Sequence, residues 1–134
     1  MKRIIMWSLL TNSVFAAPGV TELANIIGHR NPRKVFNEVL ERNSIIVVKC
    51  VSTHCPKCKK ILDGFAALAE KYHDKALFLS INVQKFDDIT DRFNLKSVPT
   101  FIIFVQGKAY KKIRGSGNLD TVARSVAELV KTLK

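Results

Sequence analysis

The chain has 134 residues, of which 47% are apolar, and this length predicts one globular domain whose core needs no disulfide staples. Its 22 Lys and Arg against 11 Asp and Glu give a formal net charge of +11, compatible with acidic protein partners, an anionic membrane surface or nucleic acid. The lysines are scattered, and no helix-turn-helix, zinc-finger or aromatic RNA-binding signature is present. This excludes a specific nucleic-acid motif and favours a solvated basic surface for acidic proteins.

Residues 1–17 have the pattern of a secretory signal peptide. Lys2 and Arg3 form a positive start, a mostly apolar stretch follows, and the segment ends in two alanines, either of which suits cleavage. The apolar stretch is short for a membrane span and carries several polar residues, so an uncleaved anchor stays open. We expect residues 18–134 to form a single domain, exported to a periplasm or secreted; without a working signal the protein would be cytoplasmic.

Hydrophobic periodicity predicts helices and strands in alternation along the rest of the chain. The pattern β-α-β-α-β-α-β-β-α indicates an α/β fold, with a mixed central sheet and helices on both faces. In chain order we expect a short edge strand near 24–27, a helix over Pro32–Arg42, a strand over Ile45–Val51, a helix over 56–73, a strand over 76–83, a short helix over 87–93, a hairpin of Thr100–Val105 and 108–113, and a last helix capped by Asn118 and ending near Thr132.

The stretch Cys55-Pro56-Lys57-Cys58 follows the central strand and opens the helix predicted over 56–73. Sulfurs three positions apart fall on one face of a helix, close enough to bridge. The first cysteine lies at the helix N-terminus, where unpaired N–H groups and the helix dipole favour the thiolate that attacks disulfides. The leading hypothesis is therefore a redox pair, with Cys55 as the nucleophile and Cys58 as the resolving cysteine.

The element order, with Cys-x-x-Cys at the second strand-to-helix junction and Val98-Pro99-Thr100 before the hairpin, resembles the thioredoxin fold from about residue 24 to 133. The resemblance implies a protein-disulfide oxidoreductase that exchanges disulfides with protein substrates and is recharged by an unidentified redox partner. It implies no organic cofactor and no metal. We expect a monomer that does not act on nucleic acid.

The resemblance also implies a substrate groove beside the cysteine pair. Pro99 is expected to be cis and to lie against the cysteines, the backbone of Val98 to pair with an extended substrate segment, and Gly115 to line the same groove. His54, Pro56 and Lys57 are the expected substrate-contacting residues around the cysteines.

Lys49 stands where thioredoxins carry a buried aspartate that assists the proton transfers of the resolving cysteine, and Ser80 stands where they carry its lysine partner. A charged Lys49 beneath the pair would favour a thiolate on Cys55 or Cys58, so this residue is a candidate modulator of the cysteine pKa. A desolvated, neutral amine could instead accept a proton. In a third interpretation the stem is buried and the ammonium reaches water.

The immediate surroundings of the cysteines also depart from the family pattern. Pro-Lys separates them where thioredoxins have Gly-Pro, and His54 replaces a tryptophan. Lys57, Lys59 and Lys60 cluster around Cys58, and positive charge stabilises the reduced thiolate, which makes the disulfide a stronger oxidant. We expect a reduction potential less negative than the roughly −270 mV of thioredoxin. His54 is either an exposed polar neighbour or a charge that varies with pH.

Two other functions stay open at this stage. In a metal-handling module, Cys55 and Cys58 would bind copper(I) or zinc, with His54 as the one obvious further ligand, short of the four that structural zinc requires. In a pure binding protein the cysteines would be incidental.

The third cysteine, Cys50, lies inside a predicted strand and is expected to be a small buried hydrophobe. Since the direction of exchange depends on the recharging partner, reduction, oxidation and isomerisation are all compatible with the sequence.

Overall fold

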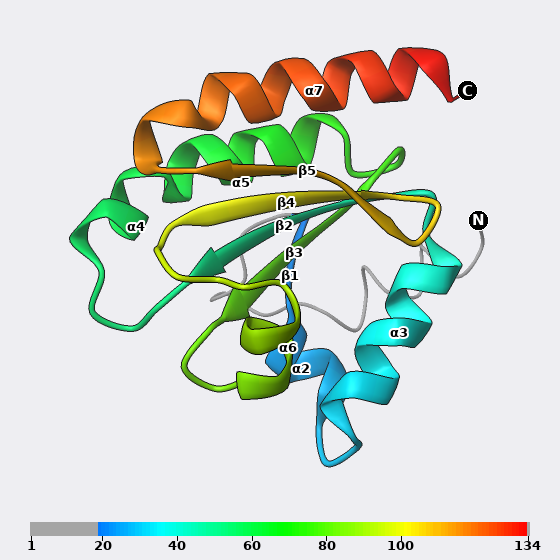
Figure 1. Ribbon diagram of the computed structural model, residues 1–134. Helices are drawn as coiled ribbons and strands as arrows, with labels where there is room; N and C mark the ends of the chain where they lie inside the picture. The colour runs from blue at the N-terminus through cyan, green and yellow to red at the C-terminus, as the bar shows by residue number, and fades with distance from the viewer. Residues whose placement is uncertain (1–18, 134) are drawn as a thin grey trace.

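The computed structural model describes residues 19–133, which form a five-stranded mixed sheet in the order β1-β3-β2-β4-β5 (Figure 1). The predicted signal peptide lies outside the described residues. Strands β1 and β2 are both parallel to β3, whereas β4 runs antiparallel to β2 and pairs with β5 in a hairpin. The strands are β1 (Val20–Glu22), β2 (Ile45–Val51), β3 (Leu77–Asn82), β4 (Thr100–Val105) and β5 (Lys108–Arg114).

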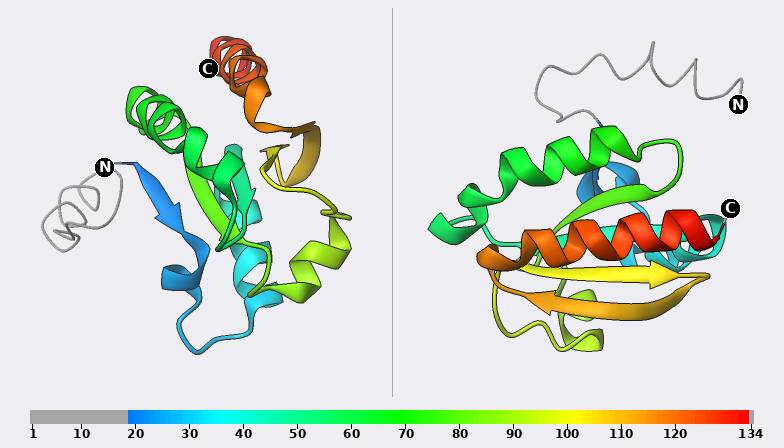
Figure 2. Two further views of the ribbon diagram at one scale, coloured as in Figure 1. Left: turned by 90° about the vertical axis from the view of Figure 1, so that its left-hand side faces the viewer. Right: turned by 90° about the horizontal axis from the view of Figure 1, so that it is seen from above.

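Helices cover both faces of this sheet, as Figures 1 and 2 show. One face carries α2 (Leu23–Ile27), α3 (Pro32–Arg42) and α6 (Asp87–Arg92), and the other carries α5 (Leu62–Lys71) and α7 (Leu119–Thr132). The short helix α4 (Pro56–Lys60) follows β2 at one end of the sheet, and a 3-10 turn over Ser116–Asn118 precedes α7. None of the helices within residues 19–133 is long and apolar enough to cross a membrane.

Alternation along β2 sends its side chains into two separate cores. Val48 joins the core under α2, α3 and α6, where Phe36 packs edge-on against Phe104. Val47 joins the core under α5 and α7, where Phe65 stacks on Phe101 with ring centroids 5.9 Å apart. A strand buried on both faces explains the unbroken apolar run in the sequence. The predicted α/β architecture is confirmed.

The first strand is not where the sequence analysis put it. The expected edge strand near 24–27 lies in helix α2, and β1 occupies Val20–Glu22. Leu23 and Ile27 are both buried and lie four residues apart, which is the spacing of one helix face rather than of one strand face. Three residues suffice for the strand because it pairs with β3 along its whole length.

The helix predicted over 56–73 is two helices. Ile61 separates α4 from α5, and its backbone (φ −101°, ψ 1°) is not helical. The Ile61 N–H bonds to the carbonyl of Cys58, an i−3 contact that tightens the chain there. Gly64 serves close packing, because a Cβ on it would collide with the Leu119 side chain of α7.

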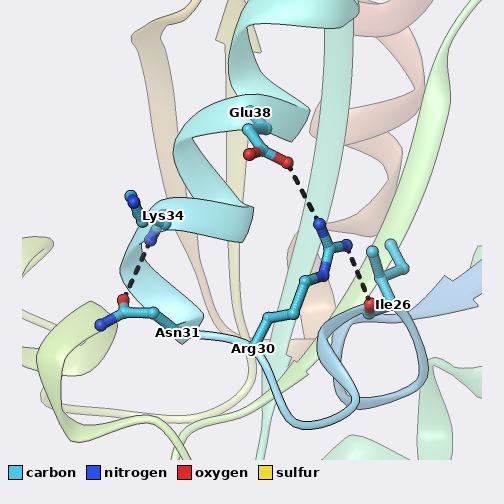
Figure 3. Close-up of polar contacts among 5 residues, drawn as sticks. All are labelled: Ile26, Arg30, Asn31, Lys34 and Glu38. Carbon is cyan, nitrogen blue, oxygen red and sulfur yellow. Dashed lines mark hydrogen bonds and ion pairs between the residues drawn. The ribbon is translucent and has the colours of Figure 1, made fainter.

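Local capping explains why α3 begins where the sequence predicts. Figure 3 shows Asn31 at the helix start, where its side-chain oxygen accepts a hydrogen bond from the backbone N–H of Lys34 at 3.1 Å. Arg30 reaches across to Glu38 and to the Ile26 carbonyl, which ties α2 to α3. The last helix differs in detail: Asn118 occupies the N-cap position, but its side chain bonds backward to the Arg114 carbonyl instead of capping α7.

Candidate active site

The two cysteines of the motif are joined in a disulfide on the first turn of α4. Cys55 is the N-cap residue, with extended backbone, and its sulfur accepts a hydrogen bond from the N–H of Cys58 at 3.1 Å. Both residues are nearly covered, Cys55 at 7% and Cys58 at 5% exposure. When the disulfide is reduced, the same N–H is in place to stabilise a thiolate on Cys55.

The sheet brings the residues before and after β4 to the same end as the cysteines. Cys50 of β2 pairs with Thr100, and Thr100 pairs in turn with Arg114. The residues just outside these pairs therefore meet where β2 leads into α4. Pro99 follows a cis peptide bond from Val98, and its carbonyl accepts a hydrogen bond from the Gly115 N–H at 2.9 Å. Gly115 has φ +97°, a backbone conformation that favours glycine.

The loop between β2 and α4 is held by residues that the sequence analysis did not single out. The side-chain oxygen of Gln84 accepts a hydrogen bond from the Thr53 N–H, and the side-chain amide of Asn82 donates one to the Thr53 hydroxyl, each at 3.1 Å. Asn82 and Gln84 come at and just after the end of β3, parallel to β2. Polar residues at the ends of two adjacent parallel strands were the signal that could have identified them.

A cavity of about 340 Å³ opens beside Cys55, lined by Thr53, His54, Cys55, Pro56 and Lys59. His54 and Pro56 are exposed and line it, whereas Lys57 is exposed on α4 but does not. Lys59 was noted in the sequence only as one charge of a cluster. The cavity is thus lined by the N-terminal cysteine of the pair and by one basic residue.

Lys49 lies on the α5 face of the sheet, in a row of paired residues that crosses four strands. Its neighbours at this level are Ser80 of β3 on one side and Phe101 of β4 on the other, and Glu22 of β1 is the next residue beyond Ser80. The Lys49 ammonium lies 5.5 Å from the centroid of the Phe65 ring, within range of a cation–π interaction. Phe65 belongs to the first turn of α5, so Lys49 lies between the sheet and the helical segment that follows Cys58.

Burial controls the protonation of Lys49. The residue is only 6% exposed, and desolvation lowers the pKa of its ammonium, while the carboxylate of Glu22 acts in the opposite direction. The buried acid and lysine of the family are therefore replaced by a different pair. The lysine, Lys49, is on β2 where the family has the acid, and the acid, Glu22, is two strands away on β1.

Comparison with known proteins identifies the family. The thioredoxin family model matches residues 28–128. The chain belongs to the thioredoxin family. Thioredoxin-1 of Drosophila melanogaster is 33% identical over 89 residues, which cover 66% of this chain and 82% of that protein. Thioredoxin H2 of Arabidopsis thaliana is 31% identical over 94 residues, 70% of this chain and 69% of that protein.

Solved thioredoxins share the fold at lower identity. The crystal structure of thioredoxin from Trypanosoma brucei brucei superposes with a TM-score of 0.72, covering 89% of this chain and 97% of that one at 18% identity. The Drosophila melanogaster thioredoxin Deadhead gives a TM-score of 0.65 at 28% identity, over 72% of this chain and 93% of that one. The predicted family and fold are confirmed.

Family and site together make this chain a protein-disulfide oxidoreductase, as the sequence predicted. The alternatives of a metal-handling or purely binding module are not favoured. Within residues 19–133 no group of three His, Cys, Asp or Glu side chains lies close enough together to hold a metal ion.

Cys50 lies on the opposite face of the sheet from Lys49, fully buried among the residues under α3 and α6. Burial raises the pKa of its thiol to about 12, so it stays protonated at neutral pH. We expect a thiol reagent at pH 8 to label at most two cysteines of the folded, reduced thioredoxin-family chain, leaving Cys50 unlabelled, and all three after denaturation. Mass spectrometry counts the labels, and rapid labelling of a third thiol in the folded protein would contradict this assignment.

Proposed function

We propose that Cys55 attacks substrate disulfides and that Cys58 resolves the product. The observation that carries this assignment is the placement of Cys55 at the start of α4, with its sulfur beside the N–H of Cys58. In the reduced protein the Cys55 thiolate attacks one sulfur of a substrate disulfide, and the other sulfur leaves as a thiolate. Cys58 then attacks the Cys55 sulfur, which releases the second substrate sulfur and forms the Cys55–Cys58 disulfide. Two electrons pass to the substrate.

The substrate segment is proposed to lie along Val98, in extended form. Among the hydrogen bonds between residues 19–133, none uses the Val98 N–H or carbonyl, which leaves both groups available to a substrate strand. The hydrogen bond from the Gly115 N–H to the Pro99 carbonyl holds the residue next to Val98 in place. His54, Pro56 and Lys57 supply exposed side chains next to the cysteines in the chain. A separate reductant must then restore the dithiol after each turnover.

We expect the pair to be more oxidising than in an ordinary thioredoxin. The last turn of α4 carries Lys57, Lys59 and Lys60 and the helix has no acid in its first turn, so positive charge favours the reduced thiolate. Equilibration with a glutathione redox buffer should give a potential less negative than about −270 mV. A value at or below that figure would contradict the electrostatic argument.

The same preparation tests the activity itself. The protein should accelerate the reduction of insulin by dithiothreitol, and its disulfide form should oxidise a dithiol peptide. Failure in both assays would remove the enzymatic proposal, whatever the potential, because the two assays cover both directions of the exchange.

A further inference from the structure

Acidic residues are absent from the segments that build the active-site face. Residues 49–62 and 93–119 contain no Asp or Glu, and all 11 acids of the chain lie elsewhere. These two segments hold the strand and loop before Cys55, helix α4, the Pro99 loop, the β4–β5 hairpin and the Gly115 turn. They carry nine basic residues: Lys49, Lys57, Lys59, Lys60, Lys96, Lys108, Lys111, Lys112 and Arg114. Not all nine lie at the active site: Lys49 is buried, and Lys108 pairs with Val105 at the opposite end of the sheet from α4. The exposed cations of α4 and those next to the Pro99 loop and the Gly115 turn are the ones near the cysteines.

Within residues 19–133, no carboxylate neutralises these cations by direct contact. The single ion pair formed within residues 19–133 joins Arg30 to Glu38 on α2 and α3. Lys57, Lys59 and Lys96 are exposed and belong to no ion pair with the described residues. An array of exposed, unpaired cations around a reactive sulfur raises the local concentration of anionic partners and their rate of encounter.

The cavity at Cys55 places one of these cations where a substrate must dock. Lys59 lines it together with Cys55 and His54. A substrate cysteine in contact with Cys55 therefore brings its neighbouring side chain into this cavity, where an ammonium is the fixed charge. A carboxylate there gains a charge-assisted hydrogen bond, and a basic side chain meets repulsion.

Acids also lie around the edges of this region. Asp63 follows α4 at the start of α5, and Asp120 lies in the first turn of α7, so both border the face on its α5–α7 side. Lys96 and Arg114, next to the Pro99 loop and the Gly115 turn, border it on the other side. Because Asp87, Asp88 and Asp91 of α6 precede Lys96 on that other side, the cations that favour an acidic segment are those of α4 beside the cavity.

Resting on the disulfide exchange proposed above, we propose that this protein selects acidic protein segments, whose reactive cysteine is flanked by Asp or Glu, and that Lys59 is a specificity-determining residue. A protein substrate fits better than nucleic acid because the cations surround a disulfide, whose exchange partner is a thiol or disulfide.

The test uses two disulfide-linked peptides that differ only in the residues flanking the cysteine, Glu in one and Lys in the other. The reduced protein should react with the Glu peptide roughly tenfold faster at low salt, since a few exposed ion pairs each contribute a factor of less than about five. The preference should shrink as ionic strength rises past about 0.1 M, where screening acts within about 10 Å. Lys59→Glu should abolish or reverse the preference, and Lys59→Arg should retain it.

Lys75→Glu is the matched control, because Lys75 is exposed in the turn before β3, at the far end of the sheet from α4. It makes the same change in net charge and should leave the preference intact. Equal effects of both charge reversals would overturn the role of Lys59.

Equal rates for the two peptides in the wild-type protein would overturn the acidic preference while leaving disulfide exchange in place. No reaction with either peptide would remove the proposed function as well. Stronger inhibition by duplex DNA than by polyglutamate at equal charge would assign the face to nucleic acid and overturn the proposal.

Discussion

Cys55→Ser should reduce the acceleration of insulin reduction on the order of a thousandfold or more, to the rate of dithiothreitol alone. A serine hydroxyl stays protonated at neutral pH, so the attacking anion is lost even though the side chain keeps its place at the start of α4. Cys58→Ser should also stop turnover, but one step later. The Cys55 thiolate still attacks, and the mixed disulfide accumulates because nothing resolves it.

The two variants therefore differ in what they trap. A non-reducing gel or intact-mass measurement should show a covalent adduct with a disulfide substrate for Cys58→Ser and none for Cys55→Ser. Cys50→Ala is the matched control, since its thiol is buried on the opposite side of the sheet and should not take part. An adduct on Cys55→Ser but not on Cys58→Ser would reverse the proposed roles.

The central elements of this fold could be predicted because their patterns are strong and local. Strand β2 reads as an unbroken apolar run because both of its faces are covered, and α3 is fixed by the Asn31 cap and by Pro32. β1 was misplaced because a three-residue edge strand carries little periodicity and owes its position to pairing with β3. The split between α4 and α5 was not predicted because Ile61, where it occurs, is neither proline nor glycine.

The chemistry of the site was predictable only where it is contiguous in sequence. Cys-x-x-Cys and the Val98–Pro99 step are short motifs, and the sheet register brings them to one end of the molecule. The Asn82 and Gln84 contacts with Thr53 depend on two strands ending side by side. The approach of Glu22 to Lys49 depends likewise on strand order, which periodicity alone does not give.

The redox centre has two groups of basic residues near it, one exposed and one buried. The exposed group is on α4, whose lysines act on substrates and are screened by salt. The buried residue is Lys49, whose burial protects its field from screening but also weakens its hold on a proton. Lys49 is therefore the better candidate for changing the pKa of the cysteine thiols. The exposed lysines of α4 are the better candidates for selecting the substrates with which the thiols react.

Lys49→Met should stabilise the folded protein at neutral pH, on the order of 1 kcal/mol, because it removes a desolvated ammonium and keeps the side-chain volume. The sign follows from linkage. Burial lowers the folded-state pKa of Lys49 below its ordinary value of 10.5, so the unfolded chain binds more protons between the two values and wild-type stability rises with pH there. The gain from the substitution should therefore be full below the lowered pKa and shrink as pH approaches 10.5. Denaturant unfolding at several pH values measures it.

The same substitution should also destabilise the cysteine thiolate of the reduced pair. Without the Lys49 cation on the Phe65 ring, the lower cysteine pKa of the reduced pair should rise, and a rise of one unit makes the potential more negative by about 30 mV. Ultraviolet titration of the thiolate and equilibration with glutathione measure the two effects. Lys75→Met, on an exposed lysine at the far end of the sheet, should change neither. A Lys49→Met protein that is more stable but has an unchanged thiolate titration would show that Lys49 lowers the stability of the fold without lowering the cysteine pKa.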